Sequence, residues 1–434
     1  MTDVTRRPRD QDRLRILYSF PHPIGAPGIG WTASNQVAEL VAAGHEVHLV
    51  AAAVDRPVDG VASLTRTMTV GGRRVPHALL GGDRAYSWHD RRAAARLRAV
   101  RPDVVHGWPL ASLRTFELAR DLGIAAVREA PNTHTAHAYA VVARELAALG
   151  IELPQRATHA FNASRLAIEQ REWDAATGVL VPSTAVERTF LDRGFPRARL
   201  LRHRYGARPD AVPARRDDPG RPFTAVFVGR CEPRKGLHHA LRAWLSSTAS
   251  QHGRLLVYGE FVPAYRDVLR DQLDHPSVEC LGFSDAPAHV FAEADVLVLP
   301  TLEEGSALVT YEAQLAGCVP LVSSAAGAVI EHGVHGLVHE PGEVAALVGH
   351  LDRLSTDPDE LARLRAGALA HADDLTWAAA NVALVAAYRA ARDLVAAGAP
   401  VARREPGAAP EPVADEASGA RPSAAEGAAH ARAD

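Results

Sequence analysis

The feature that most constrains the fold is a regular alternation of short apolar runs and helical segments in the second half of the chain. From Phe223 the sequence reads FTAVFVG, GLHHALRAWLSS, RLLVYG, YRDVLRDQL, VECLGF, HVFAEA, DVLVLP, SALVTYEAQLAG and VPLVSS. Short apolar runs bounded by Gly, Pro or polar residues predict buried strands, and the longer amphipathic segments between them predict helices. Strands that alternate with helices predict a parallel sheet. We therefore expect a doubly wound α/β domain over residues 222–375.

The first half of the chain shows the same alternation less regularly. A strand is predicted from Leu14 to Phe20, then a loop rich in Gly and Pro, a helix from about Thr32 to Ala43, and a strand HEVHLVAAA. RPDVVHGW and GIAAVREA predict later strands of the same sheet. The expected fold is therefore α/β, with two Rossmann-like doubly wound domains facing each other across a cleft, the first over residues 13–205.

Composition changes mark the remaining segments. Residues 206–221 (GARPDAVPARRDDPGR) are rich in Pro, Arg and Asp and predict an interdomain linker. Residues 376–396 predict an apolar helix. Residues 1–12 and 397–434 carry too little apolar material to offset their ordering entropy, so disorder is expected there.

Charge and cysteine content exclude several classes of protein. The formal net charge is −3, from 48 Lys and Arg against 51 Asp and Glu, so a nucleic-acid partner is not expected. No apolar run approaches the roughly 18 residues that a membrane span needs. Cys231, Cys280 and Cys318 are too far apart for a disulfide framework or a metal site. These features predict a cytoplasmic protein.

Basic residues follow the first strand of the second domain. In an open α/β sheet ligands bind at the carboxyl ends of the strands. The segment RCEPRKG places Arg230 at the end of FTAVFVG and Lys235 about one turn later. Arg can bind a diphosphate through two parallel hydrogen bonds, and Lys acts as a movable point charge. Taken alone, this segment is equally compatible with a solvated basic turn.

A second polar segment, TLEEGSALVTYEAQLAG, follows the strand DVLVLP. Gly305 would let the backbone approach a ligand closely, and a helix starting near Ser306 would offer free N–H groups to an anion. Glu304 and Glu312 could accept hydrogen bonds from sugar or ribose hydroxyls. A capping acid and a surface acid are the alternative. Two such segments at strand ends of one domain favour a ligand site.

Several of these motifs together resemble the nucleotide-sugar domain of glycosyltransferase family 4. They are GRCEPRKG, LGF followed by SD, and ADVLVLPTLEEGSALVTYEAQLAGCVPLVSS. The resemblance extends over roughly Leu14 to Ala396 and is stronger in the second domain. It implies the GT-B fold and retaining, metal-independent transfer of a hexosyl group from a nucleotide-diphosphate sugar. The acceptor would be a glycan, a lipid-linked or a small-molecule hydroxyl, as in polysaccharide biosynthesis. No cofactor and no metal are expected.

The resemblance assigns a role to each matched residue of the second domain. Arg230 and Lys235 would bind the donor diphosphate and stabilise the leaving group. Glu304 would contact the transferred sugar and Glu312 the ribose, and backbone groups around Gly282 and Phe283 would read the base. The helix over residues 376–396 would cross back to the first domain. The implied donor-binding set comprises Gly28, Gly30, Gly282, Phe283, Gly305, Ser306, Ala307, Leu308 and Glu312. The segment VYGEF departs from a Gly-x-Gly sequence that is common in the family, so contacts there are open.

The first domain matches the family less closely. The glycines at 25, 28 and 30 resemble a loop that faces the donor phosphate. His134, in EAPNTHTAH, follows a predicted strand where the family has a His that contacts the transferred sugar. His106, His22 and His137 remain alternatives, because the chain has 21 His and most will be packed or solvated.

Other functions stay open at this point. GIGWTA fits the G-x-G-x-x-A pattern of an NAD-dependent oxidoreductase. However, seven residues separate Gly28 from the predicted strand end at Phe20, whereas that turn is tight. A non-catalytic sugar-nucleotide-binding protein is a further alternative, which the intact set of charged residues argues against. The basic helix from Tyr86 to Arg101, bearing Trp88, predicts peripheral contact with an anionic membrane or, alternatively, a solvated helix. Its cations include Arg91, Arg92 and Arg96.

Overall fold

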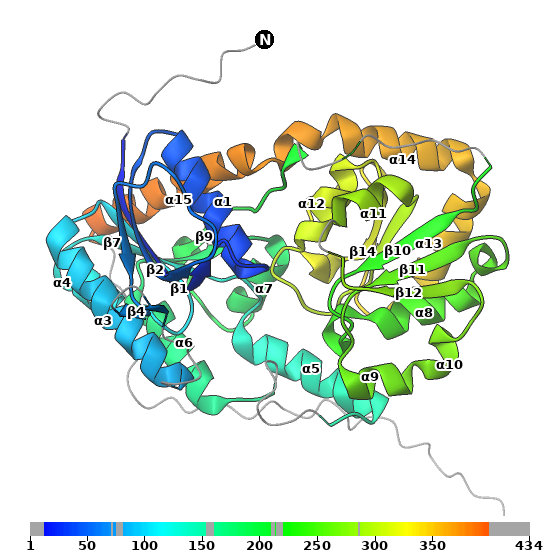
Figure 1. The fold of residues 1–434 in the computed structure, drawn as a ribbon, viewed down its shortest axis with the longest axis horizontal. Helices are drawn as coiled ribbons and strands as arrows, with labels where there is room; N and C mark the ends of the chain where they lie inside the picture. Colours follow the sequence, from blue (N-terminus) through cyan, green and yellow to red (C-terminus); the bar gives the residue numbers. More distant parts are fainter. Residues whose placement is uncertain are drawn as a thin grey trace, which may run out of the picture. The chain divides into compact units, whose positions relative to one another are not determined.

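The computed structural model describes residues 13–398, except 71–72, 75–80, 153–159, 210–212, 214–219 and 285–286. The two predicted disordered ends fall outside these residues except at Ala397 and Gly398, and so does most of the predicted linker. Within the described residues the chain forms two large parallel sheets, both flanked by helices (Figure 1). The expected fold class of two Rossmann-like units is confirmed.

The first half of the chain builds a sheet whose strand order, over the residues described, is β3-β2-β1-β6-β7-β8-β9. Neighbouring strands all pair in parallel. Its elements are β1 (Arg15–Ile24), α1 (Ile29–Ala42), β2 (Glu46–Val54), β3 (Ser63–Arg66), α3 (Gly82–Val100), β6 (Val104–Gly107), α4 (Leu113–Asp121), β7 (Ala125–Glu129), α5 (Thr135–Leu149), α6 (Ala163–Ala175), β8 (Gly178–Val181), α7 (Thr184–Leu191) and β9 (Leu200–Arg202). A short antiparallel pair, β4 (Thr69–Val70) and β5 (Arg73–Arg74), lies apart from it.

The second half builds a sheet with the order β12-β11-β10-β13-β14-β15, again counted over the residues described. Its elements are β10 (Thr224–Val228), the short 3-10 helix η3 (Pro233–Lys235), α8 (Leu237–Ser246), β11 (Arg254–Tyr258), α9 (Pro263–Val268), α10 (Arg270–Leu273), β12 (Val278–Gly282), α11 (Pro287–Glu293), β13 (Val296–Leu299), α12 (Leu308–Leu315), β14 (Val319–Ser323), β15 (Leu337–His339), α13 (Val344–Thr356), α14 (Pro358–Ala370) and α15 (Trp377–Ala396). This is the regular alternation that the sequence predicts.

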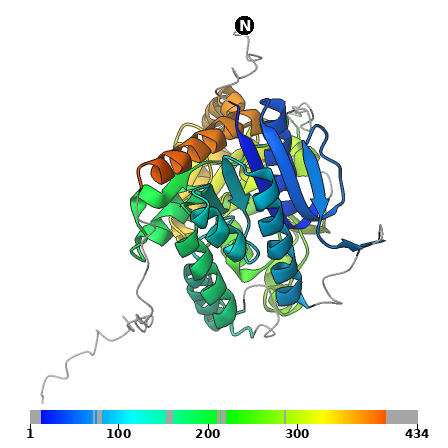
Figure 2. The same cartoon turned by 90° about the vertical axis from the view of Figure 1, so that its left-hand side faces the viewer.

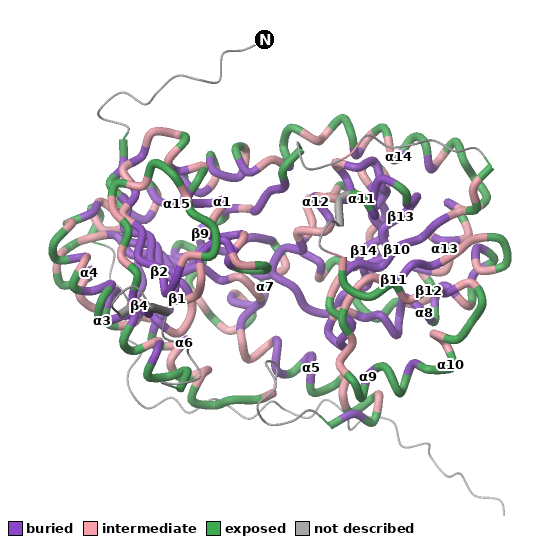
Figure 3. Tube along the Cα trace, viewed as in Figure 1, coloured by how far each residue is buried: buried purple, intermediate pink, exposed green. Residues whose placement is uncertain are grey.

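The central strands are buried along their whole length, as Figure 3 shows. Helices cover both faces of each sheet, which is why β10 and β13 are continuous runs of apolar residues rather than alternating ones. Each sheet has its own hydrophobic core. The carboxyl ends of β10 and β13 are neighbours, because these strands pair directly. Side chains that follow them therefore meet at one edge of the sheet.

Strand β1 is longer than the sequence predicts. It continues past Phe20 to Ile24, through a register shift between Phe20 and Pro23, and α1 begins at Ile29. The prolines at 21 and 23 were interpreted as loop residues, but Pro23 pairs with Ala53 of β2. Only residues 25–27 therefore separate the strand from Gly28. The spacing argument against a dinucleotide turn was wrong for this reason.

Each half of the chain contributes one helix to the core of the other. Leu384, Tyr388 and Ala391 of α15 belong to the core of the first sheet, where the helix lies beside α1. Figure 2 shows this C-terminal helix running along the first sheet. In return, Leu146 and Ile151, at the end of α5, pack in the core of the second sheet.

The basic helix α3 presents a partly apolar surface. Trp88 is 43% exposed, and its indole N–H donates to the carbonyl of Thr67 at 2.9 Å. Arg91 and Arg92 are exposed, whereas Arg96 donates to Ser63 Oγ at 3.0 Å. Contact of this face with a membrane stays a prediction. Among the described helices, none is both long and apolar enough to span a bilayer.

Candidate active site

The two cations predicted to hold a diphosphate differ in their surroundings. Arg230, just past β10, has a side chain that is 56% exposed, with Nε 3.8 Å from an oxygen of Glu232. Lys235 ends η3, and its ammonium contacts the Glu304 carboxylate. Burial and the neighbouring Arg234 lower the pKa of Lys235 to about 7. The structure thus brings together Lys235 and Glu304, while Arg230 extends toward solvent.

Arg234 is the residue of this region that the sequence interpretation missed. Its Nη1 donates to the carbonyl of Glu303 at 2.8 Å, and lies 3.3 Å from a carboxylate oxygen of both Glu303 and Glu304. Its Nε donates to Glu232 at 3.1 Å. Arg234 therefore holds the acidic segment against the basic one. The sequence signal was its place beside Lys235 in EPRKG. Two adjacent cations, Arg234 and Lys235, can pair with different members of the adjacent acids Glu303 and Glu304.

Glu303 connects the two halves of the chain. It is 1% exposed, and it accepts from both the backbone N–H (3.1 Å) and the hydroxyl (2.6 Å) of Thr133. Thr133 lies in the loop between β7 and α5. The first Glu of the EEG segment is thus held by Thr133 and Arg234, whereas Glu304 pairs with the Lys235 ammonium and the Arg234 guanidinium.

Gly305 is required by packing between chain segments rather than by a ligand alone. A Cβ at this position would lie 1.8 Å from the carbonyl oxygen of Pro131. The Ser183 hydroxyl donates to the Gly305 carbonyl at 2.5 Å. The next residue, Ser306, donates its hydroxyl to the carbonyl of Gly327 at 2.9 Å. Contacts with Pro131, Ser183 and Gly327 therefore hold the turn before α12 in place.

Helix α12 begins at Leu308, two residues later than predicted, with Ala307 as its N-cap. The Ala307 N–H donates to the Ala326 carbonyl at 3.0 Å, so it is used within the protein. The first turn after it offers N–H groups and a positive dipole end to an anion. Glu312 lies in the second turn, where burial raises the pKa of its carboxyl to about 7.

The residues predicted to read the base lie at the end of β12. Gly282 adopts a left-handed conformation (φ 74°), and its carbonyl accepts from the Gly259 N–H at 2.8 Å. Phe283 exposes 68% of its surface. Gly259, in the divergent VYGEF segment, leaves no room for a side chain, since a Cβ there would lie 1.9 Å from the Gly229 carbonyl oxygen. A base contact at this edge stays a prediction.

The predicted glycine loop caps the first helix of the chain. Gly28 is the N-cap of α1 and has a positive φ of 76°. Gly30 lies in the first turn, where a Cβ would meet the carbonyl oxygen of Pro23 at 2.6 Å. The helix start can therefore pack closely on the end of β1. Contact with a donor phosphate stays a prediction for both glycines.

His134 has a clear structural role. It is the N-cap of α5, and its Nδ1 accepts from the Ala136 N–H at 3.2 Å. The ring packs against Trp173 and Phe190, with centroids 4.5 and 5.1 Å away. Burial lowers the pKa of His134 to about 3, so the ring is neutral near pH 7. The predicted contact of His134 with the transferred sugar stays a prediction, because the packing within the protein does not test it.

His106 belongs to a buried polar network that the sequence did not reveal. Glu129, the last residue of β7, lies 3.3 Å from Nε2 of His106 and 2.9 Å from Nε2 of His203. It also accepts from the Tyr205 hydroxyl at 2.9 Å. On its other side, His106 Nδ1 lies 2.7 Å from the hydroxyl of Tyr388 on α15. The network joins β6, β7, the segment after β9 and the C-terminal helix.

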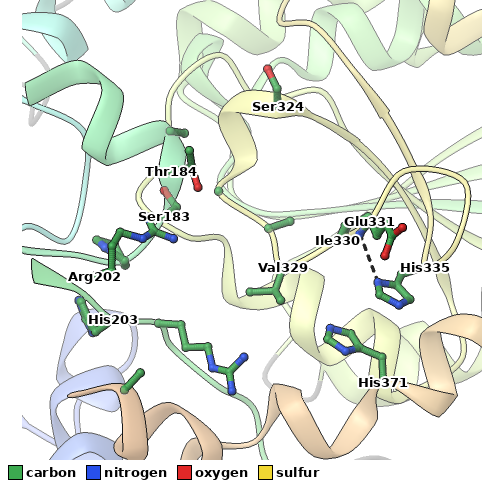
Figure 4. A pocket seen from close by; sticks show the side chains of 16 residues that line it. Ser183, Thr184, Arg202, His203, Ser324, Val329, Ile330, Glu331, His335 and His371 are labelled. Carbon is green, nitrogen blue, oxygen red and sulfur yellow. Dashed lines mark hydrogen bonds between the residues drawn. The ribbon is translucent and has the colours of Figure 1, made fainter. Parts of the chain in front are cut away.

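A cavity of about 580 Å³ lies beside the Gly305 turn, between the start of α7 and the loop that follows β14. Figure 4 shows Arg202 and Ser183 on one side of it, and His335 and His371 on the other. The two imidazoles are stacked at 4.3 Å. Ser183 and Gly327 line this cavity and also contact Gly305, so the cavity adjoins the acidic segment.

The fold, with its two Rossmann-like units, is of the GT-B type. Among solved structures, sucrose-phosphate synthase from Thermosynechococcus elongatus superposes with a TM-score of 0.65 at 18% identity, over 88% of this chain and 100% of that one. Anabaena HepE in complex with UDP-glucose gives 0.60 at 15% identity, over 86% and 98%. At such low identity these likenesses concern the fold alone.

Two family models match consecutive parts of the chain. Residues 27–202 match the model described as Glycosyltransferase Family 4, and residues 222–357 the one described as Glycosyl transferases group 1. The chain belongs to glycosyltransferase family 4. The membership argues against the dinucleotide-dependent oxidoreductase.

Curated relatives of the chain include several proteins that share one name. The D-inositol 3-phosphate glycosyltransferase of Rhodococcus erythropolis is 29% identical over 282 residues, which cover 60% of this chain and 63% of that protein. The protein of the same name from Geodermatophilus obscurus is 28% identical over 450 residues, covering 90% and 93%. The first of these alignments thus spans less than two thirds of the relative.

Proposed function

We propose that the protein transfers a sugar from a nucleotide-diphosphate donor to an acceptor hydroxyl, with retention of configuration and without a metal ion. One observation carries the proposal. The Lys235 ammonium contacts the Glu304 carboxylate where the ends of β10 and β13 adjoin. A cation suited to a diphosphate and an acid suited to sugar hydroxyls are therefore already adjacent.

Donor binding would exchange the partners of Lys235. In the ligand-free protein its ammonium is neutralised by Glu304. A diphosphate brings more negative charge than one carboxylate, so Lys235 would turn toward the phosphates and stay protonated. Glu304 would then be released to accept hydrogen bonds from the sugar, while Arg234 keeps the acidic segment in place.

The leaving nucleoside diphosphate would be stabilised from two directions. Arg230 is exposed enough to close over the phosphates, and a guanidinium can bind two phosphate oxygens at once. The first turn of α12, at Leu308, supplies backbone N–H groups. These donors act on charge that develops as the glycosidic bond breaks, which is where they lower the barrier most. Glu312 would bind the ribose hydroxyls.

The same arrangement supports transfer without a protein base. His134 is neutral, buried, and uses Nδ1 to cap α5, so it is suited to contact the sugar rather than to accept a proton. The acceptor hydroxyl would pass its proton to the leaving phosphate on the same face of the sugar, which gives retention. Arg230 and Lys235 would take the place of a metal at the phosphates.

A thermal-shift screen against nucleotide sugars tests the donor class, with UDP-, GDP- and ADP-sugars each measured on the wild type and on Lys235→Ala. We expect one base to raise the melting temperature of the wild type and to leave the variant unchanged. Transfer to a panel of polyols and sugars, inositol phosphate included, then tests the reaction. An anomeric proton signal of inverted configuration, or activity lost to EDTA and restored by Mg²⁺, would overturn the mechanism.

A further inference from the structure

A cluster of three potential metal ligands lies where α5 of the first half meets α8 of the second. Glu145 projects from α5, and its Oε2 lies 3.3 Å from Nε2 of His238 and 3.6 Å from Nε2 of His239. One ligand atom from each residue lies within 4.8 Å of the other two. Among the described residues, no other group of three His, Cys, Asp or Glu converges in this way.

The chemistry of the three groups suits a transition metal. His238 and His239 can each offer the lone pair of an imidazole nitrogen, and Glu145 can offer a carboxylate oxygen. Two imidazoles and a carboxylate are ordinary zinc ligands. Zinc bonds of about 2.0–2.1 Å in a tetrahedron place neighbouring ligand atoms roughly 3.3 Å apart. The two distances to Glu145 are close to that separation.

His239 has no hydrogen-bond partner that would explain its burial. It is 8% exposed, and neither Nδ1 nor Nε2 makes a hydrogen bond to any residue that the structure describes. A neutral imidazole always carries one donor and one acceptor, and leaving both unpaired in a buried position is unfavourable. The 3.6 Å separation from Glu145 is too long to satisfy either. A metal ion bound at Nε2 would use the free lone pair.

His238 is oriented by a second residue, as metal-binding histidines usually are. Its Nδ1 lies 2.7 Å from the hydroxyl of Tyr265 on α9, and the same hydroxyl accepts from the His238 backbone N–H at 2.8 Å. Tyr265 is fully buried. This arrangement holds the ring with Nε2 toward Glu145. Nε2 lies 3.3 Å from Glu145 Oε2, within hydrogen-bonding distance when it carries the proton. A metal ion bound by both atoms would replace that proton.

We propose that Glu145, His238 and His239 bind one divalent transition-metal ion of the Zn²⁺ type, with water in a fourth position. The ion would link α5 to α8, next to the segment that carries Lys235. It would act as a structural link between the two halves of the chain and take no part in the transfer reaction proposed above. The proposal therefore stands apart from the catalytic one.

Cobalt substitution tests the site on the full-length, tag-free protein. We expect one equivalent of Co²⁺ to give the visible absorption of a tetrahedral complex, and Zn²⁺ to displace it. His239→Ala and Glu145→Gln should each abolish the band. His239→Ala breaks no hydrogen bond, so its fold should survive, which circular dichroism checks. His252→Ala, which removes an exposed His of the same domain, should keep the band.

Thermal unfolding gives a second readout. Zn²⁺ should raise the melting temperature of the wild type and of His252→Ala, and leave His239→Ala unchanged. Donor-induced thermal shifts should be the same in His239→Ala as in the wild type, so failure of the metal site is distinguishable from failure of the transferase proposal. Absence of a tetrahedral cobalt band, or an equal band in His239→Ala, would refute the metal site.

Discussion

The two halves of the molecule each bury acidic side chains at or just past the end of a central strand, but they surround them differently. Glu129, at the end of β7, is 0% exposed and is met by two imidazoles and a hydroxyl. Glu304, just past β13, is 8% exposed and is met by the Lys235 ammonium and the Arg234 guanidinium.

The different partners of Glu129 and Glu304 indicate a structural role for the first acid and a functional role for the second. Burial alone would raise the pKa of Glu129, but His203 and His106 lower it well below the usual range, so the acid stays ionised inside a closed network. The partners of Glu129 come from segments that are distant in the sequence, and their side chains are buried. Lys235 has a flexible stem and can exchange Glu304 for a ligand. We infer that the first acid holds the fold and the second serves the donor.

Removing the buried acid of the first half should have the largest effect on stability. Glu129→Ala leaves His106, His203 and Tyr205 without their shared partner, and breaking a buried charge network costs about 3–5 kcal/mol. Urea unfolding measures the loss. Glu152→Ala, at an exposed position of the same half, should change the free energy of unfolding by less than about 0.5 kcal/mol. If the two variants were equally stable, Glu129 would not have the stabilising role that distinguishes it from Glu304.

Lys235→Ala should instead act on catalysis. Loss of one preorganised donor to a developing anion typically lowers the rate by about 10²–10³-fold. The free energy of unfolding should change little, because Glu304 keeps Arg234 as a neighbour. Steady-state kcat/KM for sugar transfer and a parallel urea titration measure both. Arg270→Ala, which removes an exposed cation paired with Asp267, should leave kcat/KM unchanged. A variant that is unstable but fully active would contradict the donor role.

Thr133→Val tests the contact that joins the two halves at the acidic segment. It removes the 2.6 Å hydrogen bond from the Thr133 hydroxyl to Glu303 and keeps the backbone N–H contact. Hydrogen bonds to charged groups contribute about 1.5–3 kcal/mol, so stability should fall by that amount. The matched substitution Thr356→Val, at an exposed hydroxyl of α13, should have little effect. Comparable losses in both would mean that the Glu303 contact is not special.

The smallest expected effect is the pH dependence of the free energy of unfolding that the Glu312 carboxyl causes. Its folded-state pKa of about 7 lies above the unfolded value of about 4.3. Between these values the unfolded chain loses a proton that the folded protein keeps, so wild-type stability falls as pH rises. Glu312→Gln removes this penalty and should be more stable by about 1–3 kcal/mol at pH 8.

At pH near 4, Glu312→Gln and the wild type should unfold at nearly the same urea concentration, because the wild-type carboxyl is then mostly protonated in both states. Glu279→Gln, at an exposed acid of β12, should show no such pH dependence. A constant difference between Glu312→Gln and the wild type at both pH values would show that packing, not charge, is responsible. Loss of donor affinity in the more stable variant would identify Glu312 as an acid kept for binding.

The sequence predicted the fold because buried parallel strands leave a strong local pattern. It failed at the end of β1, where Pro21 and Pro23 suggested a loop although the strand continues to Ile24. It also placed the start of α12 two residues early, since Ser306 is a good capping residue, but its hydroxyl bonds to Gly327 instead.

The site was predictable where a residue follows a strand directly. Lys235 and Glu304 meet because β10 and β13 are neighbours, which the alternation of elements implies. Glu303 and Arg234 were missed because their partners are set by contacts with segments remote in the sequence, such as Thr133. Glu129 was missed for the same reason. Spacing along the chain does not show which charged side chains become enclosed.

The position of α15 determines the order in which the protein can be completed during synthesis. Leu384 and Tyr388 fill the core of the first sheet, yet they leave the ribosome after both sheets have been translated. The first half therefore emerges first but lacks these apolar side chains until α15 has been translated. The second half can close earlier. A nascent chain stalled before Trp377 would leave the core residues that α15 covers exposed to chaperones.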